Sequence, residues 1–179
     1  MKSRILEKAR RIRFLLLDVD GVMTDGTIYL DSAGREMKAF NIYDGSGIYQ
    51  VQKAGIQVGI ITGRTSPIVE SRARELSISE VHQNAIEKLA VYDELLKKYD
   101  LTDAEMAYIG DDVIDLPVLK RVGLAVASAN AHSLVRKQVD WVTRKSGGQG
   151  AVREVTDLLL AARAVPTGRR RKVPQKVRY

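Results

Sequence analysis

Short apolar runs alternate with segments of helical periodicity along most of this chain. The first run covers residues 14–19, and the later ones begin at Val58, Val81, Met106, Leu124 and Trp141. Between the runs, apolar side chains recur at spacings of three and four residues, which is typical of amphipathic helices. Strands that alternate with helices indicate a parallel sheet with crossover helices. The pattern therefore predicts an α/β fold with a mainly parallel sheet.

Glycine, proline and aspartate mark where several of these elements begin or end. We expect helices over residues 45–53, 66–76, 87–99, 116–122, 133–137 and 151–162. Gly55 would end the first helix, and Pro67 stands at the first helical position of the second. A β-hairpin is expected after the first strand, pairing residues 27–30 with 36–40. Aspartate and glycine at positions 31–34 supply the chemistry of its turn.

Composition narrows the class of protein. The chain has 179 residues, of which 45% are hydrophobic, and this suits one domain with a real core. No apolar run approaches the roughly 18 residues that cross a bilayer. The run at 14–17, which follows a basic stretch, is shorter than the roughly 7 to 15 apolar residues of a signal peptide. Cysteine is absent, which excludes disulfides and thiolate sites, and we expect a cytoplasmic protein.

The formal net charge of +7 is concentrated near the C-terminus. Residues 168–179 contain six basic residues and no acidic ones, and without them the net charge is about +1. Such a stretch, with proline and glycine and few large apolar groups, is typical of a disordered tail. We therefore expect a folded domain over 1–162 and a basic tail over 163–179. Nucleic-acid binding is not expected as the main function, although the tail could dock to a polyanion, a membrane or a neighbouring subunit.

An acidic pair directly follows the first apolar run. Asp18 and Asp20 point to the same side because strand side chains alternate between faces. Two carboxylates that project together repel each other and need a cation or a shared proton. Mg²⁺ suits them because it is a hard ion that prefers oxygen ligands. The alternative is a pair of loop carboxylates that cap a helix.

Two further motifs follow later strands. Thr62 ends the run that begins at Val58, and its hydroxyl could donate a hydrogen bond to a phosphoryl oxygen. The next two residues could add to such an anion site through the Gly63 and Arg64 amides and the Arg64 guanidinium. Lys88 begins a predicted helix, and near two carboxylates it could neutralise both them and an incoming phosphate.

Three acids then follow the apolar run at 106–109. Asp111 could complete a metal site and Asp112 could support it from behind. Asp115 could cap the next helix and, like Asp112, could support the metal site from behind. In open parallel sheets, ligands bind beyond the carboxyl ends of the strands. The acids, Thr62 and Lys88 would therefore converge at one edge of the sheet.

Taken together, these motifs resemble the haloacid dehalogenase superfamily of phosphotransferases over nearly all of the predicted domain. The resemblance implies a Rossmann-like three-layer α/β/α fold. It implies that Asp18 is the nucleophile and Asp20 the general acid and base, and that Thr62 and Lys88 bind the transferring phosphoryl group. Mg²⁺ would be held by Asp18, the backbone carbonyl of Asp20, and Asp111.

A closer resemblance comes from what lies between the motifs. Most members of the superfamily insert a cap domain, but here 41 residues separate Asp20 from Thr62 and 25 separate Thr62 from Lys88. Neither gap holds a cap. The hairpin segment, with residues 40–48, 62–67 and 147–154, resembles the capless 3-deoxy-D-manno-octulosonate 8-phosphate phosphatase subfamily.

This subfamily resemblance implies a homotetramer in which the hairpins join and a neighbouring subunit covers the active site. The product would serve lipopolysaccharide synthesis. The sugar phosphate would contact Asn41, Ile42, Tyr43, Asp44, Gly45, Gly63, Arg64, Arg72 and Lys88. Tyr49 departs from the pattern, because its position is usually basic in the subfamily. His82 has no partner at a useful spacing and is interpreted as structural.

The sequence leaves three alternatives. A phosphatase for another ulosonic acid, such as a nine-carbon 9-phosphate, would share the fold and chemistry, and Arg64 favours the eight-carbon substrate. A phosphorelay receiver also clusters acids, threonine and lysine, but its acceptor aspartate ends the third strand. A non-catalytic oligomerisation module would be expected to have lost the acids that this chain retains.

Overall fold

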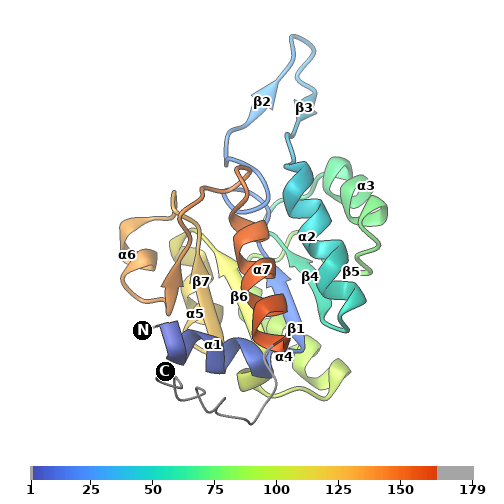
Figure 1. The fold of residues 1–179 in the computed structure, drawn as a ribbon. Helices are drawn as coiled ribbons and strands as arrows, with labels where there is room; N and C mark the ends of the chain where they lie inside the picture. Colours follow the sequence, from blue (N-terminus) through green and yellow to red (C-terminus); the bar gives the residue numbers. More distant parts are fainter. Residues whose placement is uncertain (1, 165–179) are drawn as a thin grey trace, which may run out of the picture.

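A six-stranded parallel sheet organises the computed structural model, which describes residues 2–164 (Figure 1). The strand order is β5-β4-β1-β6-β7-β8, and every neighbouring pair is parallel. The strands are β1 (Phe14–Leu17), β4 (Gln57–Ile61), β5 (Glu80–His82), β6 (Met106–Gly110), β7 (Leu124–Ala127) and β8 (Trp141–Val142). The prediction of a mainly parallel sheet is therefore confirmed.

Strand β1 lies at the centre of the sheet, between β4 and β6. All four of its residues are buried, as expected for a parallel strand that is covered on both faces. Leu15 and Leu17 pack into the hydrophobic cluster on one face, while Phe14 and Leu16 pack into the cluster on the other. The continuous apolar run that predicted this strand thus reflects two cores rather than one.

Helices cover both faces and complete three layers (Figure 1). One face is covered by α1 (Lys2–Arg11), α2 (Ile42–Lys53), α3 (Pro67–Glu75) and α7 (Ala151–Ala164). The other is covered by α4 (Lys88–Tyr99), α5 (Leu116–Leu119) and α6 (Ser133–Arg136). This confirms the three-layer α/β/α fold.

Three helices differ from their predictions. Helix α1 was not predicted, and it packs against α7, with its Ala9 buried in the core. Helix α2 begins at Ile42 rather than at residue 45, because the Asn41 side chain accepts a hydrogen bond from Tyr43 N and caps the helix. Helix α5 ends at Leu119 rather than at residue 122, and a 3₁₀ turn at Val113–Asp115 precedes it.

The predicted hairpin is present and projects away from the sheet (Figure 1). Its paired strands, β2 (Tyr29–Leu30) and β3 (Glu36–Met37), are shorter than predicted. Asp31 stabilises the turn by accepting from the Ala33 and Arg35 amides, and Gly34 takes a positive φ of 76°. An isolated two-stranded hairpin has no sheet face to pack on, which limits how far its pairing extends.

The remaining sequence predictions concern the C-terminal tail and the absence of a membrane-spanning segment. The predicted basic tail lies almost wholly outside the described residues, since α7 ends at Ala164. Among residues 2–164, none of the helices combines the length and the apolar character needed to cross a bilayer.

Candidate active site

The carboxyl ends of β1, β4 and β6 meet at one edge of the sheet, where they open into a cleft of about 240 Å³. The cleft is lined by Asp18, Asp20, Gly26, Thr62, Gly63, Arg64, Lys88, Asp111, Asp112 and Ile114. The structure therefore brings together the four motifs that the sequence analysis selected from separate parts of the chain. Parallel strands end at a common edge, which explains this convergence.

Asp18 follows β1 directly and is almost completely buried, with 6% of its surface exposed. Its Oδ1 accepts a hydrogen bond from Val19 N at 2.7 Å, and its Oδ2 lies 2.9 Å from Lys88 Nζ. Burial raises the pKa of the Asp18 carboxyl to about 7, although Lys88 acts in the opposite direction. The carboxylate is thus held in place at the bottom of the cleft.

Lys88 is held by a buried network behind Asp18. Its ammonium lies 2.6 Å from Asp115 Oδ1 and donates to the Tyr108 hydroxyl at 3.1 Å. Burial opposes the charge on Lys88, but Asp18 and Asp115 together raise its pKa above the ordinary value. Lys88 therefore remains a cation that faces the cleft.

Asp115 does not cap the next helix, which corrects one part of the prediction for this residue. Its side chain makes no capping hydrogen bond to α5. It turns back instead, and it accepts from the Asp111 and Asp112 amides at 2.9 and 3.0 Å and from Tyr108 and Lys88. The 3₁₀ turn at Val113–Asp115 makes this possible, because it aims the side chain toward β6.

Asp111 approaches the backbone of the first motif closely. Gly21 has a positive φ of 83°, and a Cβ there would lie 2.0 Å from Asp111 Oδ2. Glycine is thus required at position 21 for conformation and for space. Burial, followed by the charge of Asp18, raises the pKa of Asp111 to about 7. Asp112 is exposed, and its side chain caps the 3₁₀ turn through Val113 N.

The residues of the cleft fit a divalent cation. Carboxylate oxygens of Asp18, Asp111 and Asp115 lie within 4.8 Å of one another. Asp115 already accepts four hydrogen bonds, which leaves Asp18 and Asp111 as the better ligands. Oxygen donors of this kind suit Mg²⁺, and a cation would compensate the negative charge of two carboxylates whose burial raises their pKa values.

Thr62 and Arg64 enter the cleft from the end of β4. Thr62 is buried, and its Oγ1 accepts from Arg64 N at 3.4 Å. A Cβ on Gly63 would meet no atom within 4 Å, so the backbone is open to a ligand at that point. The Arg64 side chain is 47% exposed and lies beside Asp20, with 3.7 Å between Nε and Oδ2. A hydroxyl and a guanidinium at one strand end can bind a phosphate.

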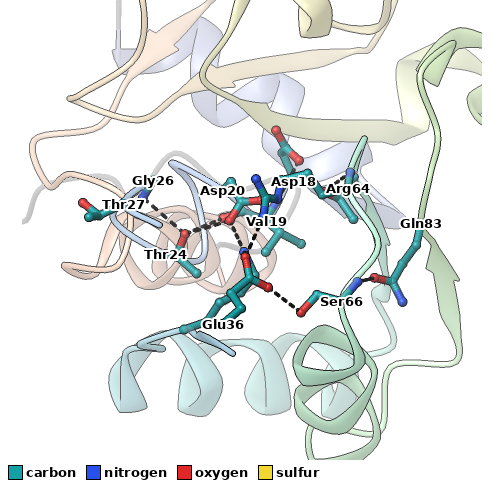
Figure 2. Close-up of polar contacts among 12 residues, drawn as sticks. Asp18, Val19, Asp20, Thr24, Gly26, Thr27, Glu36, Arg64, Ser66 and Gln83 are labelled. Carbon is teal, nitrogen blue, oxygen red and sulfur yellow. Dashed lines mark hydrogen bonds and ion pairs between the residues drawn. The ribbon is translucent and has the colours of Figure 1, made fainter. Parts of the chain in front are cut away.

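Two residues of the hairpin, Glu36 and Lys38, reach this site, although the sequence did not single them out. Figure 2 shows Glu36 beside Ser66. Lys38 Nζ lies 2.5 Å from Asp20 Oδ1, and Glu36 Oε1 lies 2.7 Å from Arg64 Nη2. The available signal was their spacing, since residues two apart in a strand share a face. Only the fold shows that Glu36 and Lys38 lie beside Arg64 and Asp20.

The predicted sugar contacts divide between two places. Arg64 lies in the cleft, but Arg72 lines a separate small cavity with Phe40 and Gly45, where its guanidinium is 5.6 Å from the Phe40 ring. Asn41 and Asp44 line the same cavity. The two arginines are eight residues apart in sequence, yet Arg64 precedes α3 and only Arg72 lies within it.

The remaining predicted contacts lie at the surface. Ile42 and Tyr43, in the first turn of α2, expose 78% and 68% of their surface, and Tyr49 is also exposed. His82 pairs with Glu80 at 3.1 Å on the edge strand β5, and its side chain does not line the cleft. A structural role for His82 agrees with this position.

Known proteins share this arrangement over most of their length. A family model for haloacid dehalogenase-like hydrolases matches residues 75–155. The Escherichia coli K12 protein named 3-deoxy-D-manno-octulosonate 8-phosphate phosphatase KdsC is 49% identical over 162 residues, covering 90% of this chain and 86% of its own.

Solved structures agree with the sequence relatives. The Yersinia pestis 3-deoxy-D-manno-octulosonate 8-phosphate phosphatase is 48% identical, with a TM-score of 0.88 over 89% of this chain and 86% of its own. The phosphatase of the same name from Moraxella catarrhalis, crystallised with magnesium, phosphate and a KDO molecule, is 41% identical. Its TM-score is 0.88 over 90% of this chain and 93% of its own. With such identity over nearly the whole length, this chain belongs to the 3-deoxy-D-manno-octulosonate 8-phosphate phosphatase family of haloacid dehalogenase-like hydrolases.

Proposed function

We propose that this hydrolase removes phosphate from 3-deoxy-D-manno-octulosonate 8-phosphate through an aspartyl-phosphate on Asp18, with Mg²⁺ as cofactor. The observation that carries the proposal is the cleft at the carboxyl end of β1. It holds the buried Asp18 carboxylate 2.9 Å from Lys88, together with Asp20, Thr62 and Asp111. The named relatives support the substrate.

In the first step, an Asp18 oxygen attacks phosphorus and the bond from phosphorus to the sugar oxygen breaks. Asp20 donates a proton to that oxygen, so that the sugar leaves as a neutral alcohol. Lys88 and the Thr62 hydroxyl contact the phosphoryl oxygens, and the positive charge of Lys88 offsets the negative charge that spreads over them.

In the second step, water attacks the phosphorus of the aspartyl-phosphate. The Asp20 carboxylate, left without its proton by the first step, accepts a proton from this water. The bond between phosphorus and the Asp18 oxygen breaks, which restores the Asp18 carboxylate and releases inorganic phosphate. The two carboxyl groups return to their starting protonation states.

Asp18, Asp111 and the backbone carbonyl of Asp20 would hold the magnesium ion. When bound, it would supply positive charge that offsets the negative charge of the phosphoryl oxygens and would orient the phosphoryl group toward Asp18. Asp112 and Asp115 would support this arrangement without binding the ion, the first by capping its turn and the second by holding Lys88.

The sugar would extend from the cleft toward Arg64, whose exposed guanidinium suits a carboxylate or phosphate group. Asn41, Ile42, Tyr43, Asp44, Gly45, Gly63 and Arg72 complete the proposed set of substrate contacts. A nine-carbon ulosonate 9-phosphate is the second candidate, because the same cleft would perform the same chemistry and only the sugar contacts would differ.

We further propose that four copies assemble through the hairpin. Its apolar side chains Ile28, Tyr29, Leu30 and Met37 expose between 41% and 62% of their surface on a projecting element. Exposed apolar groups gathered in this way are typical of interfaces. Light scattering at micromolar concentration should give a tetrameric mass, and a monomeric mass would overturn this assembly.

Phosphate release from a panel of sugar phosphates, with Mg²⁺ and with chelator, tests the proposal. We expect release to require Mg²⁺, to be fastest with the eight-carbon ulosonate, and to fall by about 1,000-fold or more in Asp18→Asn. Asp157→Asn is the matched control, because it makes the same change at an exposed position on α7.

The other outcomes of this assay discriminate between the alternatives. Faster release from a nine-carbon ulosonate would keep the mechanism and change the substrate. Absence of release from every sugar phosphate would favour the non-catalytic oligomerisation module.

A further inference from the structure

The geometry points to Lys38 as a positioning residue that holds Asp20 in the orientation needed for proton transfer. This inference rests on the proposed function and extends it to the base of the hairpin. Lys38 Nζ lies 2.5 Å from Asp20 Oδ1 and 3.4 Å from Glu36 Oε1. Lys38 does not line the cleft, so it would act through Asp20 rather than on the substrate.

The burial of Lys38 is unusual for its location. Its side chain is only 3% exposed, although it follows the exposed strand β3 of a projecting hairpin. Lysine is seldom buried without a partner, because removing an ammonium from water carries a large free-energy penalty. Asp20 and Glu36 meet that requirement. The Lys38 ammonium therefore pairs with the proposed acid and base, Asp20, and does not only stabilise the hairpin.

Both oxygens of Asp20 face charged groups. Oδ1 contacts Lys38 and lies 3.5 Å from Thr24 Oγ1, while Oδ2 faces Arg64 Nε at 3.7 Å. These contacts restrict rotation of the carboxylate. A proton donor must lie within hydrogen-bond reach of the leaving oxygen, and an error of about 1 Å in position can lower a rate by about 100-fold.

Glu36 completes the cluster and supplies a second partner for both of its cations. Its carboxylate contacts Lys38, Arg64 Nη2 and, at 3.0 Å, Ser66 Oγ. The two cations of the cluster therefore face two carboxylates, Asp20 and Glu36. Glu36 of β3 and Lys38, which follows it, link the hairpin to the ends of β1 and β4. A projecting hairpin can therefore influence chemistry in the body of the protein.

Replacing Lys38 with methionine tests the inference, because methionine keeps the apolar stem and removes the charge. The readout is kcat/KM for two substrates with different leaving groups. A sugar phosphate needs its leaving oxygen protonated by Asp20, whereas p-nitrophenyl phosphate releases a stable anion that does not. We expect kcat/KM to fall by about 10- to 100-fold for the sugar phosphate and by less than about threefold for p-nitrophenyl phosphate.

A double-mutant cycle supplies the second test. If Lys38 acts through Asp20, then Lys38→Met should have little further effect once Asp20→Asn is present. Arg35→Met is the matched control, because Arg35 is an exposed hairpin cation that pairs with Asp31 and not with the site. We expect this control to behave like the wild type toward both substrates.

Equal losses of kcat/KM for the two substrates, or an undiminished effect of Lys38→Met in the Asp20→Asn background, would overturn the inference. If the wild type is active and Lys38→Met has the same kcat/KM as the wild type, the inference about Lys38 is overturned while the proposed function stands. An inactive wild type would overturn both. Should Lys38→Met fail to fold, judged by circular dichroism, Lys38→Gln provides the same comparison with a neutral polar side chain.

Discussion

Asp115 stabilises the site from behind, although its side chain is completely buried and does not line the cleft. Its two oxygens accept from Lys88, Tyr108 and the amides of Asp111 and Asp112. It therefore connects the lysine of α4 to the turn that carries Asp111. The network behind the proposed nucleophile depends on this single carboxylate.

Replacing Asp115 with asparagine should lower the free energy of unfolding by about 3 kcal/mol, because it removes the charge that compensates the buried Lys88 and leaves an amide facing hydrogen-bond donors. Urea denaturation monitored by circular dichroism would measure this. Asp112→Asn is the control, since Asp112 is exposed and asparagine caps a turn equally well. Equal stability of the two variants would show that the network contributes little.

Asp44 should give stability a characteristic pH dependence. Burial raises its pKa from the ordinary 3.8 to about 6, despite a hydrogen bond from Arg153 N at 2.6 Å. The folded protein therefore binds this proton more tightly than the unfolded chain does. The contribution of Asp44 to stability is then fully present below about pH 3.8 and is lost as the pH rises through about 6.

Asp44→Asn should remove this dependence. Relative to the wild type, the variant should gain at most about 3 kcal/mol in free energy of unfolding between pH 4 and pH 7.5. Urea denaturation of both proteins across this range measures the difference. Parallel stability profiles for the two proteins would contradict the raised pKa.

At the scale of elements, helices α2 and α7 approach each other closely at Gly47. A Cβ at this position would lie 2.2 Å from Thr156 Oγ1 and 3.0 Å from Arg153 Cδ. Asp44, one turn earlier on α2, accepts from Arg153 N on α7. Glycine inside a helix normally weakens it, so its presence here is explained by packing rather than by helix propensity.

Gly47→Ala should therefore destabilise the protein by about 1 to 3 kcal/mol, because the overpacking outweighs the better helix propensity of alanine. Thermal unfolding followed by circular dichroism would measure the change. Ser46→Ala, at the neighbouring exposed position of α2, should be neutral or slightly stabilising. A stabilised Gly47→Ala variant would show that the two helices can separate without penalty.

For the whole molecule, the acidic cleft couples metal binding to global stability. Mg²⁺ that binds only the folded state should stabilise it by about 2.7 kcal/mol at a concentration 100 times its dissociation constant. In a chain of this size, that corresponds to a rise in Tm of roughly 5 to 10 °C.

Calorimetry with Mg²⁺ and with chelator would measure this shift. Asp111→Asn should abolish most of it, since one proposed ligand is lost. Asp157→Asn should retain it, because Asp157 is exposed and distant in sequence from the cluster. A full shift in Asp111→Asn would exclude Asp111 as a ligand.

Local patterns in the sequence predicted most of the secondary structure and the central chemistry. Apolar runs located the strands of the parallel sheet, because a strand buried on both faces must be apolar throughout. The motif residues Asp18, Thr62 and Asp111 could be assigned to one cleft because they follow strands, and parallel strands end at a common edge. Helix α1 was missed, since its basic stretch hid the buried Ala9 and Ile12.

Only the tertiary structure decided which side chains meet across elements. Asp115 turns back to Lys88 instead of capping α5, and Arg72 lies against Phe40 in a cavity that Arg64 does not line. Lys38 reaches Asp20 across 18 positions of the chain. Spacing within one strand or helix follows from backbone geometry, and the sequence therefore contains it. The meeting of a hairpin, a turn and a buried lysine depends on how whole elements pack, which no local pattern encodes.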